Sequence, residues 1–344
     1  MNNYTPKHIL VTGGAGFIGC NFIRHLLQSD PTIFILNLDK LTYAGSFVNL
    51  QNLPDPHRYV FVQGDIGDES LVNELLHKYT IDTVVHFAAE SHVDRSIHSP
   101  RQFLQTNITG TFTLLEAACR YWKDKNGLSV QACRFHHIST DEVYGSLGPH
   151  DPAFTESSVY APNSPYSASK AASDHLVRSY QHTYHLPTTI THCSNNYGPY
   201  QHSEKFIPTV IASCLKQKPI PVYGNGSNIR DWIHVMDHCI GIEQVLRKGT
   251  AGEKYNLGGN CELANLAVVD YITNYFDQLY PECQPHNKLI HYVTDRPGHD
   301  WRYAINSSKA QHELGWQLRY SFQDGIRDTV KWFIANQATA GEVI

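Results

Sequence analysis

Residues 8–19 read HILVTGGAGFIG, and this stretch decides the fold. A short apolar run ends in a turn with glycines at positions 13, 16 and 19, and a helix-like pattern over residues 17–27 follows at once. Glycines in such a turn let the backbone approach a pyrophosphate, which then rests on the helix N-terminus. The strand–turn–helix order therefore predicts a dinucleotide site and disfavours the alternative that the glycines only make a turn.

The rest of the first half repeats this alternation. Strand-like runs lie at residues 33–39, 59–65, 82–89, 133–139 and 188–195, and helix-like stretches at residues 69–79, 107–122 and 168–184. Such alternation predicts an α/β fold with a doubly wound parallel sheet of the Rossmann type. Asp39 ends the second run, about 20 residues after Gly19, where a carboxylate accepts hydrogen bonds from the adenosine ribose; NAD is therefore favoured over NADP.

The composition changes past residue 198, where Pro, Gly and Tyr become frequent. We expect residues 1–197 to form the dinucleotide-binding domain, with later segments near residues 232–260 returning to it. Residues 198–231 and 261–334 are expected to form mainly a smaller, loop-rich lobe that binds the substrate.

Bulk composition narrows the class of protein. The 344 residues carry a net charge of −5, which argues against general nucleic-acid binding. No apolar run has the roughly 18–20 residues that a membrane span needs, and the N-terminus lacks the layout of a signal peptide, so we expect a cytoplasmic protein without membrane contact. The eight cysteines form no Cys-x-x-Cys pair and the histidines are scattered, so no metal site is expected.

Two further motifs carry chemistry. Residues 166–170 read YSASK, and a helix would place Tyr166 and Lys170 on one face, where the ammonium group is expected to lower the pKa of the phenol and make a general base. Residues 139–145 read STDEVYG, with Asp141 and Glu142 just after a strand. Adjacent carboxyl groups in different environments can divide acid and base duties, whereas a surface turn or cap is the structural alternative for Asp141.

With these motifs in place, the chain resembles the extended short-chain dehydrogenase/reductase family and, within it, the dTDP-glucose 4,6-dehydratases. The resemblance covers roughly residues 7 to 334. It includes DKLTYAG (39–45), HFAAESHVDRSI (86–97), CSNNYGPYQ (193–201), IRDWIHV (229–235) and DRPGHD (295–300).

The resemblance implies a reaction in which dTDP-glucose becomes a nucleotide-linked 4-keto-6-deoxyglucose plus water, with NAD as the cofactor. Tyr166 would take the proton of the C4 hydroxyl while C4 is oxidised. Glu142 would remove the C5 proton, and Asp141 would protonate the departing C6 hydroxyl. Thr140 would support the tyrosine, and Lys170 would also hold the nicotinamide ribose. Rhamnose is the usual destination of the product, although other deoxysugars share the step.

The resemblance also implies two sets of binding residues. The cofactor set comprises Gly13, Gly16, Phe17, Ile18, Gly19, Asp39, Lys40, Leu41, Thr42, Asp65, Ile66, Phe87, Ala88, Ala89, Ser91, Thr106, Tyr166, Lys170 and Asn196. The substrate set comprises Ser91, Thr140, Asn195, Lys205, Phe206, Pro221, Val222, Tyr223, Arg230, Asn265, Arg296 and His299. Its cationic members are expected to meet the diphosphate of a sugar nucleotide.

Rival functions remain at this point. A UDP-glucose 4,6-dehydratase would share the chemistry, because thymine and uracil differ by one methyl group. The Asp141–Glu142 pair disfavours an epimerase or decarboxylase, and the presence of Tyr166, Lys170 and Glu142 disfavours a non-catalytic NAD-binding scaffold. By resemblance we expect a homodimer that pairs helices near residues 107–122 and 167–184.

Overall fold

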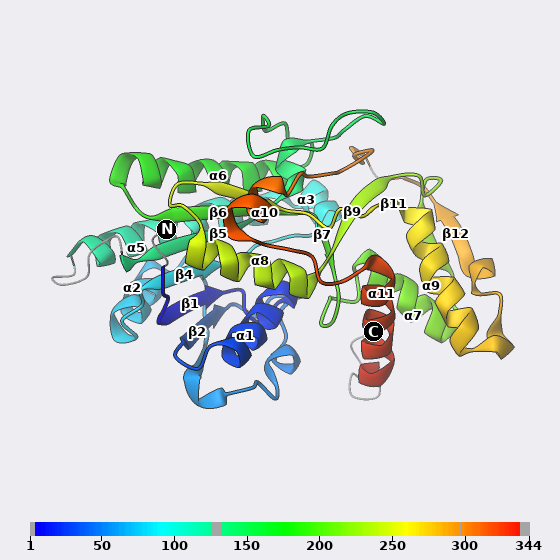
Figure 1. Cartoon of the computed structure of the whole chain (residues 1–344), viewed down its shortest axis with the longest axis horizontal. Helices are drawn as coiled ribbons and strands as arrows, with labels where there is room; N and C mark the ends of the chain where they lie inside the picture. The colour runs from blue at the N-terminus through cyan, green and yellow to red at the C-terminus, as the bar shows by residue number, and fades with distance from the viewer. Residues whose placement is uncertain (1–3, 125–131, 296, 338–344) are drawn as a thin grey trace.

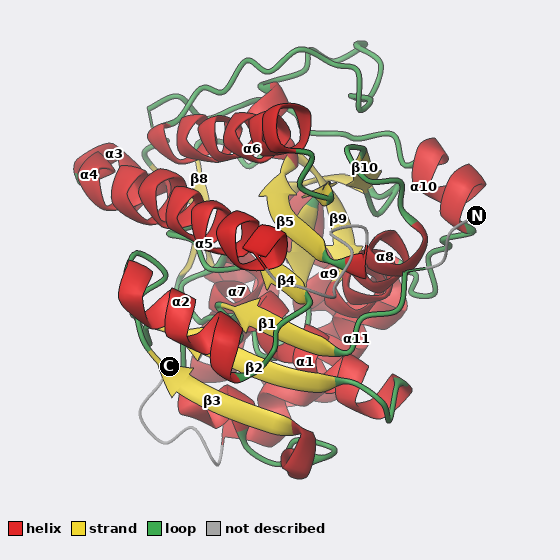
Figure 2. Ribbon diagram, turned by 90° about the vertical axis from the view of Figure 1, so that its left-hand side faces the viewer, coloured by secondary structure: helices red, strands yellow, loops and turns green. Residues whose placement is uncertain are grey.

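A seven-stranded parallel sheet forms the centre of the molecule (Figures 1 and 2). The computed structural model describes residues 4–124, 132–295 and 297–337. The strand order is β10-β6-β5-β4-β1-β2-β3. The strands are β1 (His8–Thr12), β2 (Phe34–Asp39), β3 (Tyr59–Gln63), β4 (Thr83–His86), β5 (Arg134–Thr140), β6 (Thr188–Cys193) and β10 (Lys254–Leu257). The predicted α/β fold with a doubly wound parallel sheet is confirmed.

Helices cover both faces of this sheet. The first face carries α1 (Phe17–Ser29) and α8 (Val235–Lys248), and the second carries α2 (Glu69–Lys78), α5 (Thr111–Asp124) and α6 (Pro165–Tyr184). Because side chains alternate along a strand, Ile9 and Val11 of β1 pack in the apolar core of the first face and Leu10 in that of the second. Both faces of the strands are therefore buried, as a doubly wound sheet requires.

Several element boundaries differ from the sequence prediction. β4 ends at His86, since the chain then turns past the glycine loop. α6 begins at Pro165, because Ser164 and Ser167 form a reciprocal capping box there. The stretch before α5 comprises α3 (Val93–His98), α4 (Pro100–Phe103) and a π-helical segment, η3 (Leu104–Gly110). Short 3-10 turns are η1 (Phe47–Leu50), η2 (Pro56–Arg58), η5 (Asp141–Tyr144), η6 (Pro281–Cys283) and η7 (His286–Leu289).

A smaller lobe follows the main sheet and has its own apolar core. Its strands are β7 (Asn195–Tyr197), β9 (Ile229–His234) and β11 (Glu262–Ala264) in one sheet, with β8 (Ile220–Tyr223) and β12 (Ile290–Val293) in another. Its helices are α7 (Phe206–Lys216), α9 (Asn265–Leu279) and α11 (Phe322–Gln337). The segment with α10 (Ser308–Leu314) packs instead on the main domain, where Trp316 joins the core beside α8.

Within the described ranges, no helix is both long and apolar enough to cross a bilayer.

Candidate active site

A cavity of about 320 Å³ opens at the carboxyl edge of the sheet. All strands of a parallel sheet end at the same edge, and loops that follow neighbouring strands meet there. The loops after β1, β2, β4 and β5 line the cavity together with the start of α6 and the residues that follow β6. The motifs at residues 12–19, 139–145 and 166–170 are thereby brought to one place.

The glycine turn closes the cavity floor by close backbone contact. Gly13 has a φ of +73°, and a Cβ there would lie 2.6 Å from the backbone N of Ala88. A Cβ on Gly19 would lie 2.4 Å from the carbonyl oxygen of Gly13. Only glycine fits at either position. In the described chain no side chain caps the N-terminus of α1, so its first amide groups are available to an anion in the cavity.

Asp39 supports this turn from the end of β2. One carboxylate oxygen accepts the N–H of Ala15 and the other accepts the N–H of Leu41, both at 2.8 Å. Burial raises the pKa of Asp39, and these two hydrogen bonds lower it. Nearby, Lys40 pairs with Asp65 at 2.7 Å on the exposed rim. The dinucleotide end is thus held by contacts within the protein itself.

Asp141 lies directly after β5, at the start of η5. The hydroxyl of Thr140 accepts the Glu142 N–H at 3.3 Å, so Thr140, and not Asp141, caps this turn. Asp141 is only 2% exposed, which rules out the exposed-cap interpretation. Burial raises the pKa of Asp141 well above its usual value, and the charges of Glu142 and Asp231 raise it further. Burial and the neighbouring charges therefore favour the protonated form of Asp141.

Tyr166 lies in the first turn of α6 and is buried. Burial raises the pKa of Tyr166 well above its usual value, the charge of Glu142 raises it further, and a hydrogen bond with Thr140 lowers it. The expected lowering of the Tyr166 pKa is therefore not found in this geometry, because burial, the largest effect, raises it. One turn later, the Lys170 ammonium donates to the carbonyl of Ile138 at 2.7 Å, and burial lowers its pKa to about 8.

Two asparagines close the cavity where β6 passes into β7. The side-chain oxygen of Asn196 lies 2.9 Å from Nδ1 of His238. Oδ1 of Asn195 is buried, and among the described residues it has no hydrogen-bond partner. The same is true of Oδ2 of Asp141. A polar ligand in the cavity would satisfy both atoms.

The lobe contributes few residues to the cavity. Lys205, just before α7, lines it and donates to the carbonyl of Ser91 at 3.2 Å. Arg230, on β9 of the lobe, is buried; it donates to the Asp300 carbonyl at 3.0 Å and lies 4.3 Å from the ring centre of Tyr303. Its charge still acts on Asp141, whose pKa it lowers.

The structure separates the candidate residues into two groups. All of the proposed cofactor residues except Leu41 line the cavity, as do the five proposed catalytic residues. Of the proposed substrate residues, Ser91, Thr140, Asn195 and Lys205 line it, whereas Phe206, Pro221, Val222, Tyr223, Arg230, Asn265 and His299 lie outside its lining. Arg296 falls outside the described residues. The side chain of Val222 is fully buried in the core of the lobe.

The lining also includes polar residues that the sequence analysis did not select: Glu90, Ser139, Cys193, Ser194, Gln201 and His202. Each lies within a quoted motif or beside one, so motif membership was the available signal. Elsewhere in the described part of the chain, no three His, Cys, Asp or Glu side chains gather as metal ligands would.

Comparison with known proteins identifies relatives over nearly the whole length. A family model described as GDP-mannose 4,6 dehydratase matches residues 10–329. A dTDP-glucose 4,6-dehydratase of Xanthomonas campestris pv. campestris is 55% identical over 330 residues, which is 95% of this chain and 93% of the relative. The enzyme of the same name from Salmonella typhimurium is 50% identical over 337 residues, again with 95% and 93% covered.

Solved structures agree with these relatives. The dTDP-glucose 4,6-dehydratase of Streptomyces venezuelae, with NAD and dTDP bound, is 44% identical with a TM-score of 0.87 and covers 96% of this chain and 98% of that chain. A UDP-glucose 4-epimerase of Thermotoga maritima has a TM-score of 0.83 at only 25% identity, covering 96% and 99%. The fold is therefore shared by different reactions, and the site residues must distinguish them.

The doubly wound sheet, the glycine turn and the Tyr166–Lys170 pair together define the class of extended short-chain dehydrogenases/reductases. Within that class, the chain belongs to the GDP-mannose 4,6 dehydratase family.

Proposed function

We propose that this chain is a dTDP-glucose 4,6-dehydratase that converts dTDP-glucose to dTDP-4-keto-6-deoxyglucose and water, with NAD as its cofactor. The observation that carries the proposal is the Asp141–Glu142 pair in one cavity with Tyr166 and Lys170. An oxidation needs only the second pair, whereas the loss of water also needs an acid and a base. The relatives that are 50–55% identical carry the same name and support the choice of substrate.

The cavity suits a dinucleotide. The uncapped N-terminus of α1 would receive the pyrophosphate, and Asp39 would accept from the adenosine ribose. Lys170 and Asn196 would hold the nicotinamide end. When bound, NAD supplies the two-electron oxidation of the sugar at C4, returns the electrons at C6, and brings a positive ring that favours the phenolate form of Tyr166.

Tyr166 performs the first proton transfer. As a phenolate it takes the proton of the C4 hydroxyl while C4 becomes a ketone. Thr140 stabilises the phenolate through the hydrogen bond that lowers the pKa of Tyr166. Burial of the site excludes water that would otherwise compete for the proton.

The two carboxyl groups then divide the elimination. The C4 ketone makes the C5 hydrogen acidic, and Glu142 removes it. The buried Asp141 carries a proton because its pKa is raised, and it donates this proton to the C6 hydroxyl, which leaves as water. Glu142 finally returns its proton to C5. The different burial of the two groups supports this division, since Asp141 is buried and Glu142 is only partly buried.

The proton count shows what must happen between turnovers. Glu142 ends as it began, but Tyr166 has gained a proton and Asp141 has lost one. The dTDP product carries no extra charge, so one proton has to pass from Tyr166 to Asp141 before the next cycle. Exchange with solvent after product release would complete this step.

The lobe would bind the nucleotide part of the substrate. Lys205 is positioned to meet the sugar-phosphate region as a point charge, and Arg230 would reach the diphosphate after a rearrangement of its contacts to carbonyl groups. Pro221 and Tyr223, which are exposed on β8, would border the base. Arg296 and His299 belong to the same expected set.

We also infer that the chain forms a homodimer and acts in the cytoplasm. Figure 2 shows α5 and α6 side by side, and the apolar side chains of Leu104, Phe112 and Tyr184 are more than two-fifths exposed along this helical layer. Light scattering should give the mass of a dimer, and Phe112→Asp should give a monomer. Val159→Asp, on the loop before α6, should leave the dimer intact. A monomeric wild type would contradict the dimer.

The free cysteines suit a reducing compartment, which supports the proposed location in the cytoplasm.

The proposed function is tested by supplying dTDP-glucose and, separately, UDP-glucose to the purified protein and measuring the loss of one water by mass spectrometry. We expect rapid conversion of the thymidine compound and much slower conversion of the uridine compound. Faster conversion of UDP-glucose would support the rival dehydratase. Conversion of neither by a protein that carries NAD would reject both.

A further inference from the structure

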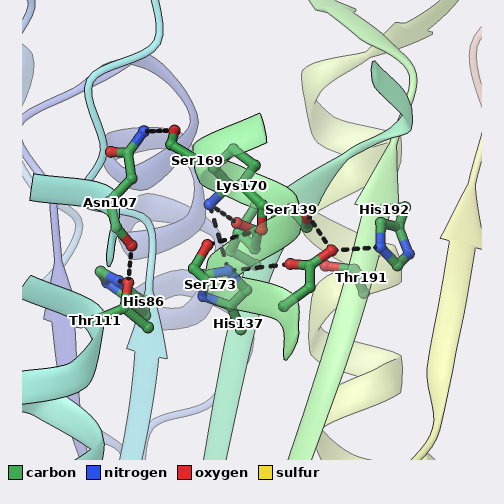
Figure 3. A network of polar contacts seen from close by, with 12 residues as sticks. His86, Asn107, Thr111, His137, Ser139, Ser169, Lys170, Ser173, Thr191 and His192 are labelled. Atoms are coloured by element: carbon green, nitrogen blue, oxygen red, sulfur yellow. Dashed lines mark hydrogen bonds and ion pairs between the residues drawn. The ribbon is translucent and has the colours of Figure 1, made fainter. Parts of the chain in front are cut away.

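A buried polar network surrounds Lys170 (Figure 3). Its centre is Asp174, one helical turn after Lys170 on α6 and only 2% exposed. Neither Asp174 nor its histidine partners line the cavity, and the proposed mechanism gives them no proton to move.

Four side chains hold the Asp174 carboxylate. Its Oδ2 lies 2.9 Å from Nε2 of His192 on β6, 2.9 Å from the hydroxyl of Ser139 on β5 and 3.0 Å from the hydroxyl of Tyr160 in the loop before α6. Its Oδ1 lies 3.3 Å from Nε2 of His137 on β5. Burial alone would raise the pKa of Asp174, but the hydrogen bonds from the two histidines lower it below its usual value. The carboxylate is therefore ionised.

His137 joins this charge to the catalytic lysine. Its Nε2 lies 3.4 Å from the Lys170 ammonium and 3.3 Å from Oδ1 of Asp174. The ring is fully buried, and burial lowers its pKa to about 4, so it is neutral at physiological pH. The single nitrogen Nε2 therefore faces both the cation and the anion, and in the neutral ring it hydrogen-bonds to only one of them at a time. His136, its neighbour on β5, points to the other face and contacts Thr189 and Thr191 instead.

Burial of a charged group lowers the stability of a protein, and the Asp174 carboxylate contacts neither the proposed substrate nor the proposed cofactor. A buried carboxylate loses its hydration, so a network that keeps it ionised needs compensating interactions. Lys170 is the buried cation in reach. Its own burial disfavours the ammonium form, and the charge of Asp174 opposes that effect.

We propose that Asp174 is a positioning residue for Lys170: held by His137, His192, Ser139 and Tyr160, it supplies the buried negative charge that keeps the lysine protonated and directed into the cavity. This inference rests on the proposed role of Lys170 in the dehydratase reaction. Asp174 acts through the lysine and touches neither substrate nor cofactor.

Other ionisable groups also surround the pair. His86 on β4 and Cys193 on β6 act on the charge of Lys170, and Tyr166 on α6 lines the same cavity. Cys193 would add to the effect of Asp174 if it ionised. Burial raises the pKa of Cys193 to about 12, so it stays neutral in the working range. Tyr144 of η5 and Lys254 of β10 face Asp174 from the far side. Asp174 is thus the anion that matters to Lys170 at neutral pH.

The test is the pH dependence of kcat for purified wild type, Asp174→Asn and Tyr160→Phe. The substitution at Asp174 removes the charge, so Lys170 should lose its proton at lower pH, and the alkaline limb of the profile should move down by about one pH unit or more. Tyr160→Phe removes one donor and keeps the charge, so its alkaline limb should stay with the wild type. If kcat of Asp174→Asn were lower at every pH but its alkaline limb stayed at the wild-type pH, the proposal would be overturned.

A second pair of variants carries the test if Asp174→Asn does not fold. His137→Gln offers an amide N–H to Asp174 and an amide oxygen to Lys170 in place of the imidazole, so the alkaline limb should be retained. His137→Leu removes the polar group that contacts both Lys170 and Asp174, so the ammonium loses its fixed position beside the carboxylate and the limb should move to lower pH. Equal profiles for these two variants would overturn the proposal. Wild-type turnover of dTDP-glucose is measured first, so a failure of the proposed function is distinguished from a failure of this inference.

Discussion

Asp39 and Asp141 occupy equivalent positions in two halves of one cavity, yet their environments are opposite. Each lies at the carboxyl end of a parallel strand, and they are 8% and 2% exposed. Asp39 receives two backbone N–H groups, whereas Oδ2 of Asp141 has no partner in the described chain, and Asp141 faces the charge of Glu142. In the binding half, both carboxylate oxygens of Asp39 have partners within the protein alone. The reacting half leaves polar atoms unsatisfied until a substrate arrives.

The largest expected effect belongs to the reacting half. Tyr166→Phe removes the group that we propose as the acceptor of the C4 proton, so turnover of dTDP-glucose should fall by roughly 10²–10⁴-fold. The fold should be preserved, because Phe keeps the buried ring. Steady-state rates and thermal unfolding of the same samples check both points. If the variant retained more than roughly a tenth of the activity, the loss would be no larger than that of a minor contact, and another group would have to be the base.

The binding half should respond through stability. Asp39→Asn leaves one of the two backbone N–H groups facing an amide nitrogen, so the free energy of unfolding should fall by about 1–3 kcal/mol. Denaturant titration measures this change. Asp65→Asn is the matched control, since its ion pair with Lys40 is exposed and is worth little, about 0–1 kcal/mol. Equal losses for the two variants would mean that Asp39 does not support the glycine turn.

The smallest change in stability, and one of opposite sign, is expected at Asp141. Its pKa is raised in the folded protein, so the native state keeps the proton to higher pH than the unfolded chain does. This contribution to stability is complete below pH about 4, the unfolded carboxyl pKa, and is lost as the pH rises toward the folded value. Asp141→Asn removes the penalty, so it should stabilise the protein at neutral pH by about 0.5–2 kcal/mol while abolishing turnover.

The pH series for this variant compares wild type and Asp141→Asn by thermal unfolding. Their difference should grow as the pH rises from acid to neutral. A difference in stability that is the same at all pH values would mean that the pKa of Asp141 is not raised in the native state. The environments of Asp141 and Asp39 would then not differ as described.

The sequence predicted the binding half well because its signals are local. The spacing of glycines after an apolar run, and an acidic residue at the end of the next run, report backbone geometry within one strand–helix–strand unit. The i, i+4 spacing likewise brought Tyr166 and Lys170 to one helix face.

What the sequence did not reveal depends on packing between distant segments. The raised pKa of Tyr166 results from burial and from Glu142, which lies 24 positions earlier in the chain. The Asp174 network requires the register of β5 with β6, which pairs His137 with Ile190 and Ser139 with His192. Val222 was predicted to bind substrate because it lies in a motif with Pro221 and Tyr223. Those neighbours on β8 are exposed, whereas the side chain of Val222 is buried in the lobe.

One measurement tests the division of labour most directly: the near-ultraviolet absorbance of reduced NAD after dTDP-glucose is mixed with Glu142→Gln. In our account Tyr166 still allows oxidation at C4, but no base removes the C5 proton. Reduced cofactor should therefore accumulate and persist, and mass spectrometry should detect no loss of water. Full turnover, or no reduction of the cofactor at all, would contradict the assignment of oxidation to Tyr166 and of elimination to the Asp141–Glu142 pair.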